Sequence, residues 1–215
     1  MQKSAFTMIE LIFVIVVIGA VTGAAVSRAD RDFRQDASTQ ILQDIRYTQH
    51  LALMDNKTDP FNTNWQSSLW TIQFNSRDGG TVWMYYIGSN ITGTDFSQNE
   101  TAVDPLNGNN FFDDNDGVQD PGESSRIFLT QNFGIVGISF NSTATGASGS
   151  NSAQHVGFDY MGRPHRGIVN GGGNSYANIM HSDLNITFTM IDGGTFNIIV
   201  EDQTGAAYID GQEES

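Results

Sequence analysis

The order of apolar and polar positions divides this chain into a continuous apolar run, an amphipathic stretch and a series of short alternating segments. The apolar run covers residues 6–26 and contains a single acid, Glu10. At about 1.5 Å per residue it spans roughly 31 Å, which matches the thickness of the hydrocarbon core of a bilayer. We therefore predict a transmembrane or filament-core helix over residues 6–27, preceded by a short polar leader, residues 1–5.

The helical periodicity continues beyond the apolar run. Apolar residues recur at helical intervals between residues 33 and 52, which indicates a helix with one apolar face. The apolar positions are Phe33, Ala37, Ile41, Leu42, Ile45 and Ala52, and the polar side chains assigned to the other faces are Gln35, Gln43, Asp44 and Arg46. Breaker residues in the segment 55–60 end the pattern near Met54. We predict an amphipathic continuation of the helix over residues 28–55.

The remainder of the chain, residues 56–215, consists of short apolar stretches between Gly- and Asn-rich turns. Alternation of apolar and polar residues predicts strands with one buried and one exposed face. The predicted strands lie in residues 70–74, 81–87, 127–129, 136–140, 156–158, 184–190 and 196–200. Turn sequences at 76–80 and 192–194 predict two hairpins. The expected head is an antiparallel β-sheet covered on one side by the apolar face of the helix.

The N-terminal residues carry a specific motif. A basic residue, Lys3, precedes a small residue, Ala5, and the apolar run then opens with Phe6 and places Glu10 within it. This motif resembles the class III signal of the type IV pilin family, which includes the pseudopilins of type II secretion. The resemblance implies that a prepilin peptidase cleaves between Ala5 and Phe6 and methylates the new amino terminus. It also implies that Glu10 attracts the amino terminus of a neighbouring subunit during filament assembly.

The same resemblance implies a fold class. The expected fold is α+β and pilin-like, with a long N-terminal helix, half transmembrane and half amphipathic, packed on an antiparallel β-sheet head. A second segment, residues 41–53, is similar to the corresponding region of minor pseudopilins of the H type.

The implied function is that of a structural subunit of a type II secretion pseudopilus, not of an enzyme. Expected partners are other pilin or pseudopilin subunits, the prepilin peptidase, the inner-membrane assembly platform and a secreted substrate. The expected location is the bacterial inner membrane, crossed once with the head in the periplasm, before assembly into a periplasmic pseudopilus or a surface pilus. Two alternatives stay open: a minor type IV pilin acting in adhesion, motility or DNA uptake, and a tip module that recognises secreted substrate.

The composition of the chain excludes several kinds of partner and site for the head. The formal net charge is −14, with 24 acidic and 10 basic residues, and the chain has no cysteine. An acidic surface disfavours nucleic acid as a partner, because binding to phosphates depends on Lys and Arg. The absence of cysteine excludes disulfides, thiolate catalysis and Cys-ligated zinc.

One acidic segment predicts a metal site within the loop 104–123. Calcium loops of the EF-hand kind place oxygen ligands at alternate positions, with a glycine at position 6 for a sharp turn. When Gly117 is placed at position 6, most of the ligand positions fall on residues with oxygen donors. The segment also resembles loops of secreted bacterial calcium-binding modules. The predicted Ca²⁺ ligands are Asp113, Asp114, Asp116, the Val118 carbonyl, Asp120 and Glu123. The alternative is a solvated acidic turn.

The alignment places no oxygen-bearing side chain at the first ligand position of this loop. It falls on Phe112, so Asp113 or Asn110 is expected to substitute there. Asp104, Asn107 and Asn109 are candidates for additional ligands. The expected role of the ion is structural, because it would hold a long loop in one conformation.

Overall fold

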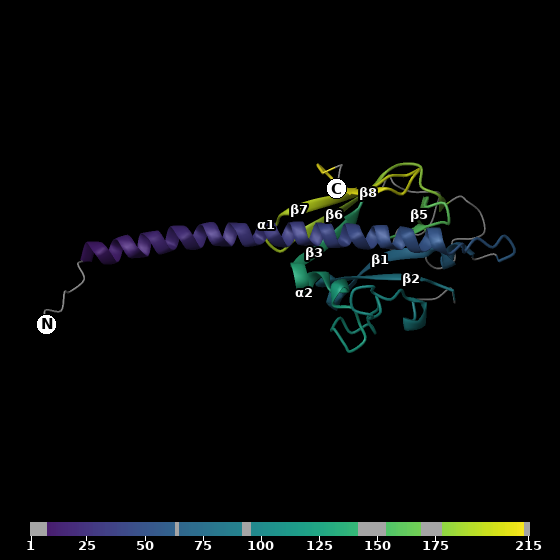
Figure 1. Cartoon of the computed structure of the whole chain (residues 1–215), viewed down its shortest axis with the longest axis horizontal. Helices are drawn as coiled ribbons and strands as arrows, with labels where there is room; N and C mark the ends of the chain where they lie inside the picture. Colours follow the sequence, from purple (N-terminus) through teal and green to yellow (C-terminus); the bar gives the residue numbers. More distant parts are fainter. Residues whose placement is uncertain (1–7, 63–64, 92–95, 142–153, 169–177, 213–215) are drawn as a thin grey trace.

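The computed structural model describes residues 8–62, 65–91, 96–141, 154–168 and 178–212, without the side chains of residues 23–32. Helix α1, Met8–Met54, is 47 residues long. Its first half projects away from the rest of the molecule, and its second half lies along the β-rich head (Figure 1). The helix ends at Met54, as the breaker residues predict.

The head contains eight strands and several short helical turns within the described residues. The strands are β1 (Trp70–Arg77), β2 (Val82–Ser89), β3 (Ile135–Phe140), β4 (Gln154–Phe158), β5 (Pro164–His165), β6 (Leu184–Met190), β7 (Thr195–Val200) and β8 (Ala207–Ile209). The short helices are η1 (Trp65–Ser68), η2 (Asp78–Gly80), η3 (Gln98–Glu100), η4 (Ser125–Ile127) and α2 (Leu129–Phe133). Every paired strand runs antiparallel to its neighbour.

The strands form two four-stranded sheets, ordered β2-β1-β4-β5 and β3-β6-β7-β8. Both predicted hairpins are confirmed. Strand β1 pairs with β2 around η2, and β6 pairs with β7 around the turn at 192–194. Buried and partly exposed residues alternate strictly along β6, as its sequence predicts.

One core joins both sheets to α1. The second half of α1 contacts β1 and β4 of one sheet and β7 and β8 of the other. Phe74 on β1 meets Phe188 on β6 edge to face, with ring centroids 5.6 Å apart. On the helix, Ile41 and Ile45 are fully buried in the same cluster. The apolar face of α1 therefore covers two sheets at once.

The predicted fold class, a pilin-like helix with a transmembrane half packed on one antiparallel sheet, is wrong. The head has two four-stranded sheets. Among the described residues, no helix combines the length and the apolar character needed to cross a membrane. The number of sheets was missed because alternation shows which face of a strand is buried, but not which strand lies beside it. Strand β4 pairs with β1, and β3 pairs with β6, across long connections.

Three local predictions also need correction. Residues 127–129 do not form a strand, because they lie where η4 ends and α2 begins. Phe33 is 52% exposed and does not belong to the buried face of α1. Asp44, assigned to the polar faces, is only 2% exposed. The position of Asp44, three residues after Ile41 and four before Thr48, places it on the buried face of the helix.

Candidate functional site

The N-terminal motif is only partly within the described residues. Ala5 and Phe6, the predicted cleavage and methylation site, lie outside them. Glu10 is described and lies in the first turn of α1, where its side chain is exposed. An acid in the first turn also suits the partial positive charge of a helix N-terminus.

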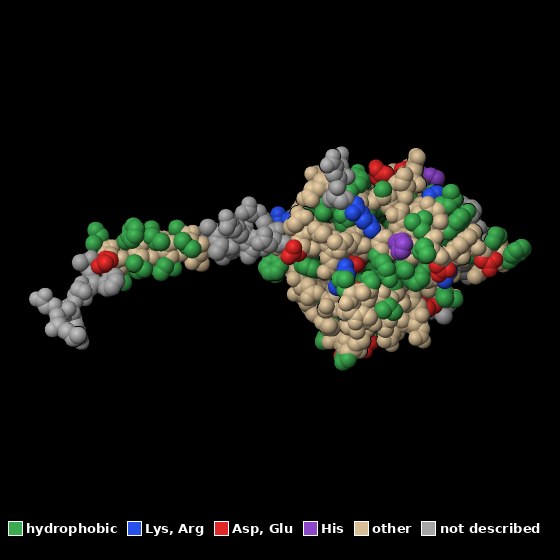
Figure 2. Space-filling model, in the orientation of Figure 1, with side chains coloured by type: hydrophobic (Ala, Val, Ile, Leu, Met, Phe, Trp, Pro, Cys, Tyr) green, Lys and Arg blue, Asp and Glu red, His purple; other side chains and the backbone are tan. Residues whose placement is uncertain are grey.

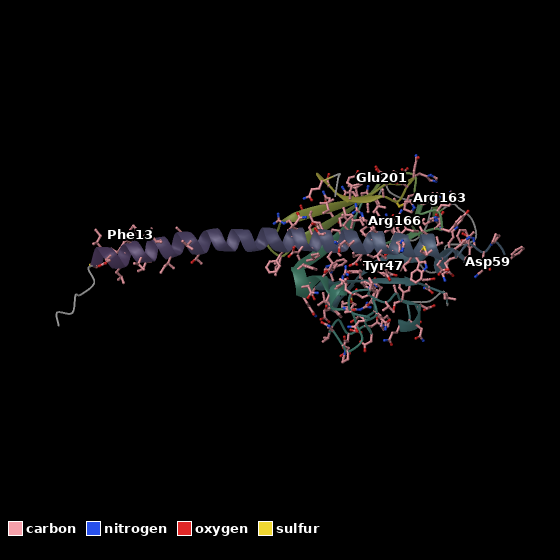
Figure 3. The ribbon with its side chains drawn as sticks, in the orientation of Figure 1. Phe13, Tyr47, Asp59, Arg163, Arg166 and Glu201 are labelled. Carbon is pink, nitrogen blue, oxygen red and sulfur yellow. The ribbon has the colours of Figure 1, made fainter. Side chains whose placement is uncertain are left out.

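Apolar side chains surround Glu10 on all sides of the projecting helix. Between Met8 and Val21, the large apolar residues are 41–83% exposed. Figure 2 shows apolar side chains in green along the projecting helix. Figure 3 places Phe13 near the end of this helix that lies away from the head. An exposed apolar surface of this extent marks a site of association with another apolar surface.

The acidic loop follows η3 and packs beside β1 and β2. The side chains of Asp113, Asp114 and Asp116 each bring a carboxylate oxygen within 4.8 Å of the others. Gly117 adopts φ 76°, a left-handed conformation that glycine tolerates without strain, as its predicted position at the sharp turn requires. Three of the six predicted ligands therefore converge.

Two buried carboxylates of the loop also accept hydrogen bonds from its backbone and so help to fix its conformation. Asp113 is fully buried, and it accepts hydrogen bonds from the backbone N–H of Asn115 and of Gly117, both at 3.0 Å. Glu123, 4% exposed, accepts from the backbone N–H of Asp114 at 3.0 Å and of Asp120 at 2.9 Å. Burial raises the pKa of Glu123, and the two N–H donors oppose that rise.

The fit of a cation to this loop is partial. Asp114 and Asp116 are exposed, so a cation can reach them. Asp113 forms an ion pair with Arg77, whose Nε lies 3.7 Å from Asp113 Oδ2. Asp120 and Glu123 do not belong to the cluster of three carboxylates found among the described residues. An oxygen-only donor set suits hard divalent cations in general and does not by itself select Ca²⁺.

The candidate additional ligands have other roles. Asp104 is fully buried, accepts from Ser124 Oγ at 2.6 Å, and lies 3.5 Å from Arg126 Nη1. The side chain of Asn107 accepts from the backbone N–H of Asn109. Asn109 in turn donates to the carbonyl of Glu123. These residues close the base of the loop.

A buried polar network that sequence reasoning missed ties this loop to α1. Arg126 Nη2 donates to Asp44 Oδ1 at 2.6 Å, and the Tyr85 hydroxyl donates to Asp44 Oδ2 at 2.5 Å. Burial raises the pKa of Asp44 to about 6, against the lowering effects of Tyr85 and Arg126. Since Arg126 also contacts Asp104, its guanidinium joins the helix to the base of the loop, and Asp44 joins the helix to β2 through Tyr85.

A second buried acid organises the turn after β4. Asp159 is fully buried, and its Oδ2 accepts from Arg163 Nε at 2.8 Å and lies 3.3 Å from His165 Nε2. Burial alone would raise the pKa of Asp159, but the hydrogen bonds from His165 and Arg163 together outweigh it and lower the pKa to about 2. This cluster fixes the turn that leads into β5.

Comparison of the chain with protein-family models, with curated proteins and with solved structures gave no match.

Proposed function

We propose that this chain is a structural subunit of a type II secretion pseudopilus, cleaved by a prepilin peptidase between Ala5 and Phe6 and assembled through its apolar N-terminal helix. The proposal locates the chain at the bacterial inner membrane before assembly, with the head in the periplasm. Its partners are other subunits of the filament, the peptidase and the assembly platform. The role is mechanical and needs no catalytic residue.

The observation that carries the proposal is the projecting part of α1. A helix that is apolar all round is stable only when other apolar surfaces cover it. In this structure Met8–Val21 extend beyond the head, so the described part of the same chain does not cover them (Figure 1). Helices of neighbouring subunits supply that cover in a filament, and burial gains about 25 cal/mol per Å² of apolar surface.

The exposed apolar surface continues onto the head where α1 enters it. Phe33 on the helix and Ile191 after β6 are 52% and 79% exposed. Both line a cavity of about 260 Å³, together with Phe133 at the end of α2. Next to it, Arg34 Nη2 bonds Asp192 Oδ2 at 2.9 Å and fixes the helix to the β6–β7 turn. A neighbouring subunit that follows the projecting helix therefore also meets apolar surface on the head.

A minor type IV pilin would use the same projecting helix, so the two functions need a genetic test. Deleting the gene in the source organism and scoring secreted enzyme activity beside surface pili separates them. The proposal predicts lost secretion with intact pili, restored by the gene supplied in trans. Lost pili, twitching or DNA uptake with intact secretion would assign the chain to a type IV pilus instead.

A structural cation in the acidic loop is a second part of the proposal. We expect Ca²⁺ to raise the melting temperature of the full chain by several degrees, because saturation at about 100 times Kd adds roughly 2.7 kcal/mol to the free energy of unfolding. Thermal unfolding in EDTA, in CaCl₂ and in MgCl₂ measures the effect and its selectivity. Asp116→Asn should reduce the shift.

The matched control for this experiment is Asp210→Asn, which changes an exposed carboxylate outside the loop. Its calcium-dependent shift should equal that of the unmodified chain. Identical melting curves with and without Ca²⁺ would show that the segment is a solvated acidic turn. Equal shifts in Ca²⁺ and Mg²⁺ would show a divalent-cation site without preference for calcium.

A further inference from the structure

A small polar cavity of about 130 Å³ opens between β1 and the middle of the acidic loop. Its walls combine polar and aromatic side chains from segments far apart in the sequence. The polar residues are Gln73, Asn75, Arg77, Asp113 and Asn115, and the aromatic residues are Tyr86, Phe96 and Phe112. None of them has a role in the filament interface proposed above, and of these residues only Asp113 also belongs to the candidate cation cluster.

The charges in this cavity cancel. Arg77 Nη2 donates to the Tyr86 hydroxyl at 2.7 Å and to Asn115 Oδ1, and Arg77 Nε lies 3.7 Å from Asp113 Oδ2. Burial raises the pKa of Tyr86, so its hydroxyl stays neutral and also donates to Asp113 Oδ2 at 3.2 Å. The fixed guanidinium disfavours a cationic ligand, and the nearby loop carboxylates disfavour an anion. The opposite charges around the cavity therefore favour a neutral ligand.

Hydrogen-bonding capacity remains on two amides of β1. Gln73 Nε2 donates to Asn75 Oδ1 at 3.2 Å. Within the described part of the chain, Gln73 Oε1 and Asn75 Nδ2 have no protein partner, and neither atom is among the buried unpaired ones. The pair therefore offers one acceptor and one donor on adjacent side chains of the same strand face. This arrangement suits a ligand that both donates and accepts, as a hydroxyl does.

The aromatic side of the cavity is held in place by packing. Phe96 and Phe112 are partly buried against the main core, and the rings of Phe112 and Tyr86 have centroids 6.1 Å apart. Gly88 on β2 makes room for Phe96, because a Cβ atom at that position would lie 2.9 Å from the Phe96 ring and 2.7 Å from the Glu100 carbonyl. Fixed phenyl rings beside amide groups present an apolar surface next to hydrogen-bonding groups.

We propose that this cavity binds one neutral pyranose unit, with ring hydroxyls bonded to Gln73 and Asn75 and with the apolar C–H groups of the sugar against Phe96 and Phe112. A sugar ring has this combination of neutral charge, dense hydroxyl groups and an apolar face. The unit is either a free monosaccharide or the end of a longer glycan, since both present the same chemistry. This inference does not depend on filament assembly.

Saturation-transfer NMR on the purified full chain tests the proposal. The probes are D-glucose, D-galactose, D-mannose and N-acetyl-D-glucosamine, each also as its methyl glycoside to represent a glycan end. We expect transfer to the ring C–H protons of at least one probe and binding about tenfold weaker in Asn75→Ala, as the loss of one well-placed hydrogen bond predicts. Phe96→Leu keeps an apolar side chain but should lower the transfer, because the ring face is lost.

Gln203→Ala removes an exposed amide elsewhere on the head and serves as the matched control; its binding should be unchanged. The melting temperatures of all variants establish that the head remains folded. Absence of transfer to every probe would overturn the proposal, and so would transfer that persists unchanged in both Asn75→Ala and Phe96→Leu. Binding of the free sugar alone indicates a monosaccharide ligand, whereas equal binding of the methyl glycoside indicates a glycan end.

Discussion

Glu10→Ala should lower incorporation of the chain into filaments by at least about tenfold, while the total amount of chain in the cell stays the same. Assembly would surround Glu10 with the apolar side chains of neighbouring helices and remove it from water. A buried carboxylate needs an opposite charge, and in the proposed assembly that charge would be the amino terminus of a neighbouring subunit. Removing the carboxylate leaves that amino group buried and unpaired, which is the costly outcome for an ion pair.

Sheared filament fractions and whole-cell immunoblots measure this effect. Glu10→Gln keeps the size of the side chain but not its charge, so it should fail like Glu10→Ala. The matched control is Glu201→Ala, on the head and away from the projecting helix (Figure 3). Normal incorporation of both Glu10 variants would remove the role given to this acid.

Arg126→Met should lower the free energy of unfolding at pH 7 by about 3–5 kcal/mol, because it leaves the buried acids Asp44 and Asp104 without their shared cation. The matched control is Arg34→Met, which also breaks an Arg–Asp pair between α1 and another element. Both side chains of that pair are about one-third exposed. We expect a loss below about 1 kcal/mol there. Urea unfolding followed by tryptophan fluorescence measures both variants. A loss below about 1 kcal/mol in Arg126→Met would show that the buried network does not stabilise the head.

The same network predicts a pH dependence. In the folded chain the pKa of Asp44 is raised from its ordinary value of 3.8 to about 6, so the folded state binds a proton more tightly than the unfolded state. Asp44 therefore favours folding most below pH 4, and this contribution falls as the pH rises towards 6, by on the order of 2–3 kcal/mol. Asp44→Asn is neutral at every pH and should lack that slope. In Arg126→Met the slope should extend above pH 6, because the cation that lowers this pKa is gone.

The sequence predicted those features that depend on neighbouring residues. The end of α1 at Met54 follows from breaker residues directly after it. The hairpins β1–β2 and β6–β7 follow from alternation around short turns, and the left-handed conformation of Gly117 follows from its place in the acidic loop. In each case the backbone geometry is decided within a few residues, so local pattern is sufficient evidence.

The acidic loop shows where local pattern stops being sufficient. The residue types identified Asp113, Asp114 and Asp116 as a group, and they do lie together. The same pattern assigned Glu123 as a ligand, yet its carboxylate is occupied by two backbone N–H groups of the loop. Spacing cannot show whether a carboxylate faces a common centre or binds the backbone, because both uses place acids at turns.

The sequence by itself determined the apolar first part of α1 with its one acid, the places of most strands and the net negative charge of the chain. Tertiary structure alone decided that the strands form two sheets, that Asp44 is buried, and that Arg126 pairs with it across 82 residues. The physical reason is the range of the interactions. Turns and periodicity act over a few residues, whereas strand pairing and buried charge pairs are selected by which distant surfaces exclude water together.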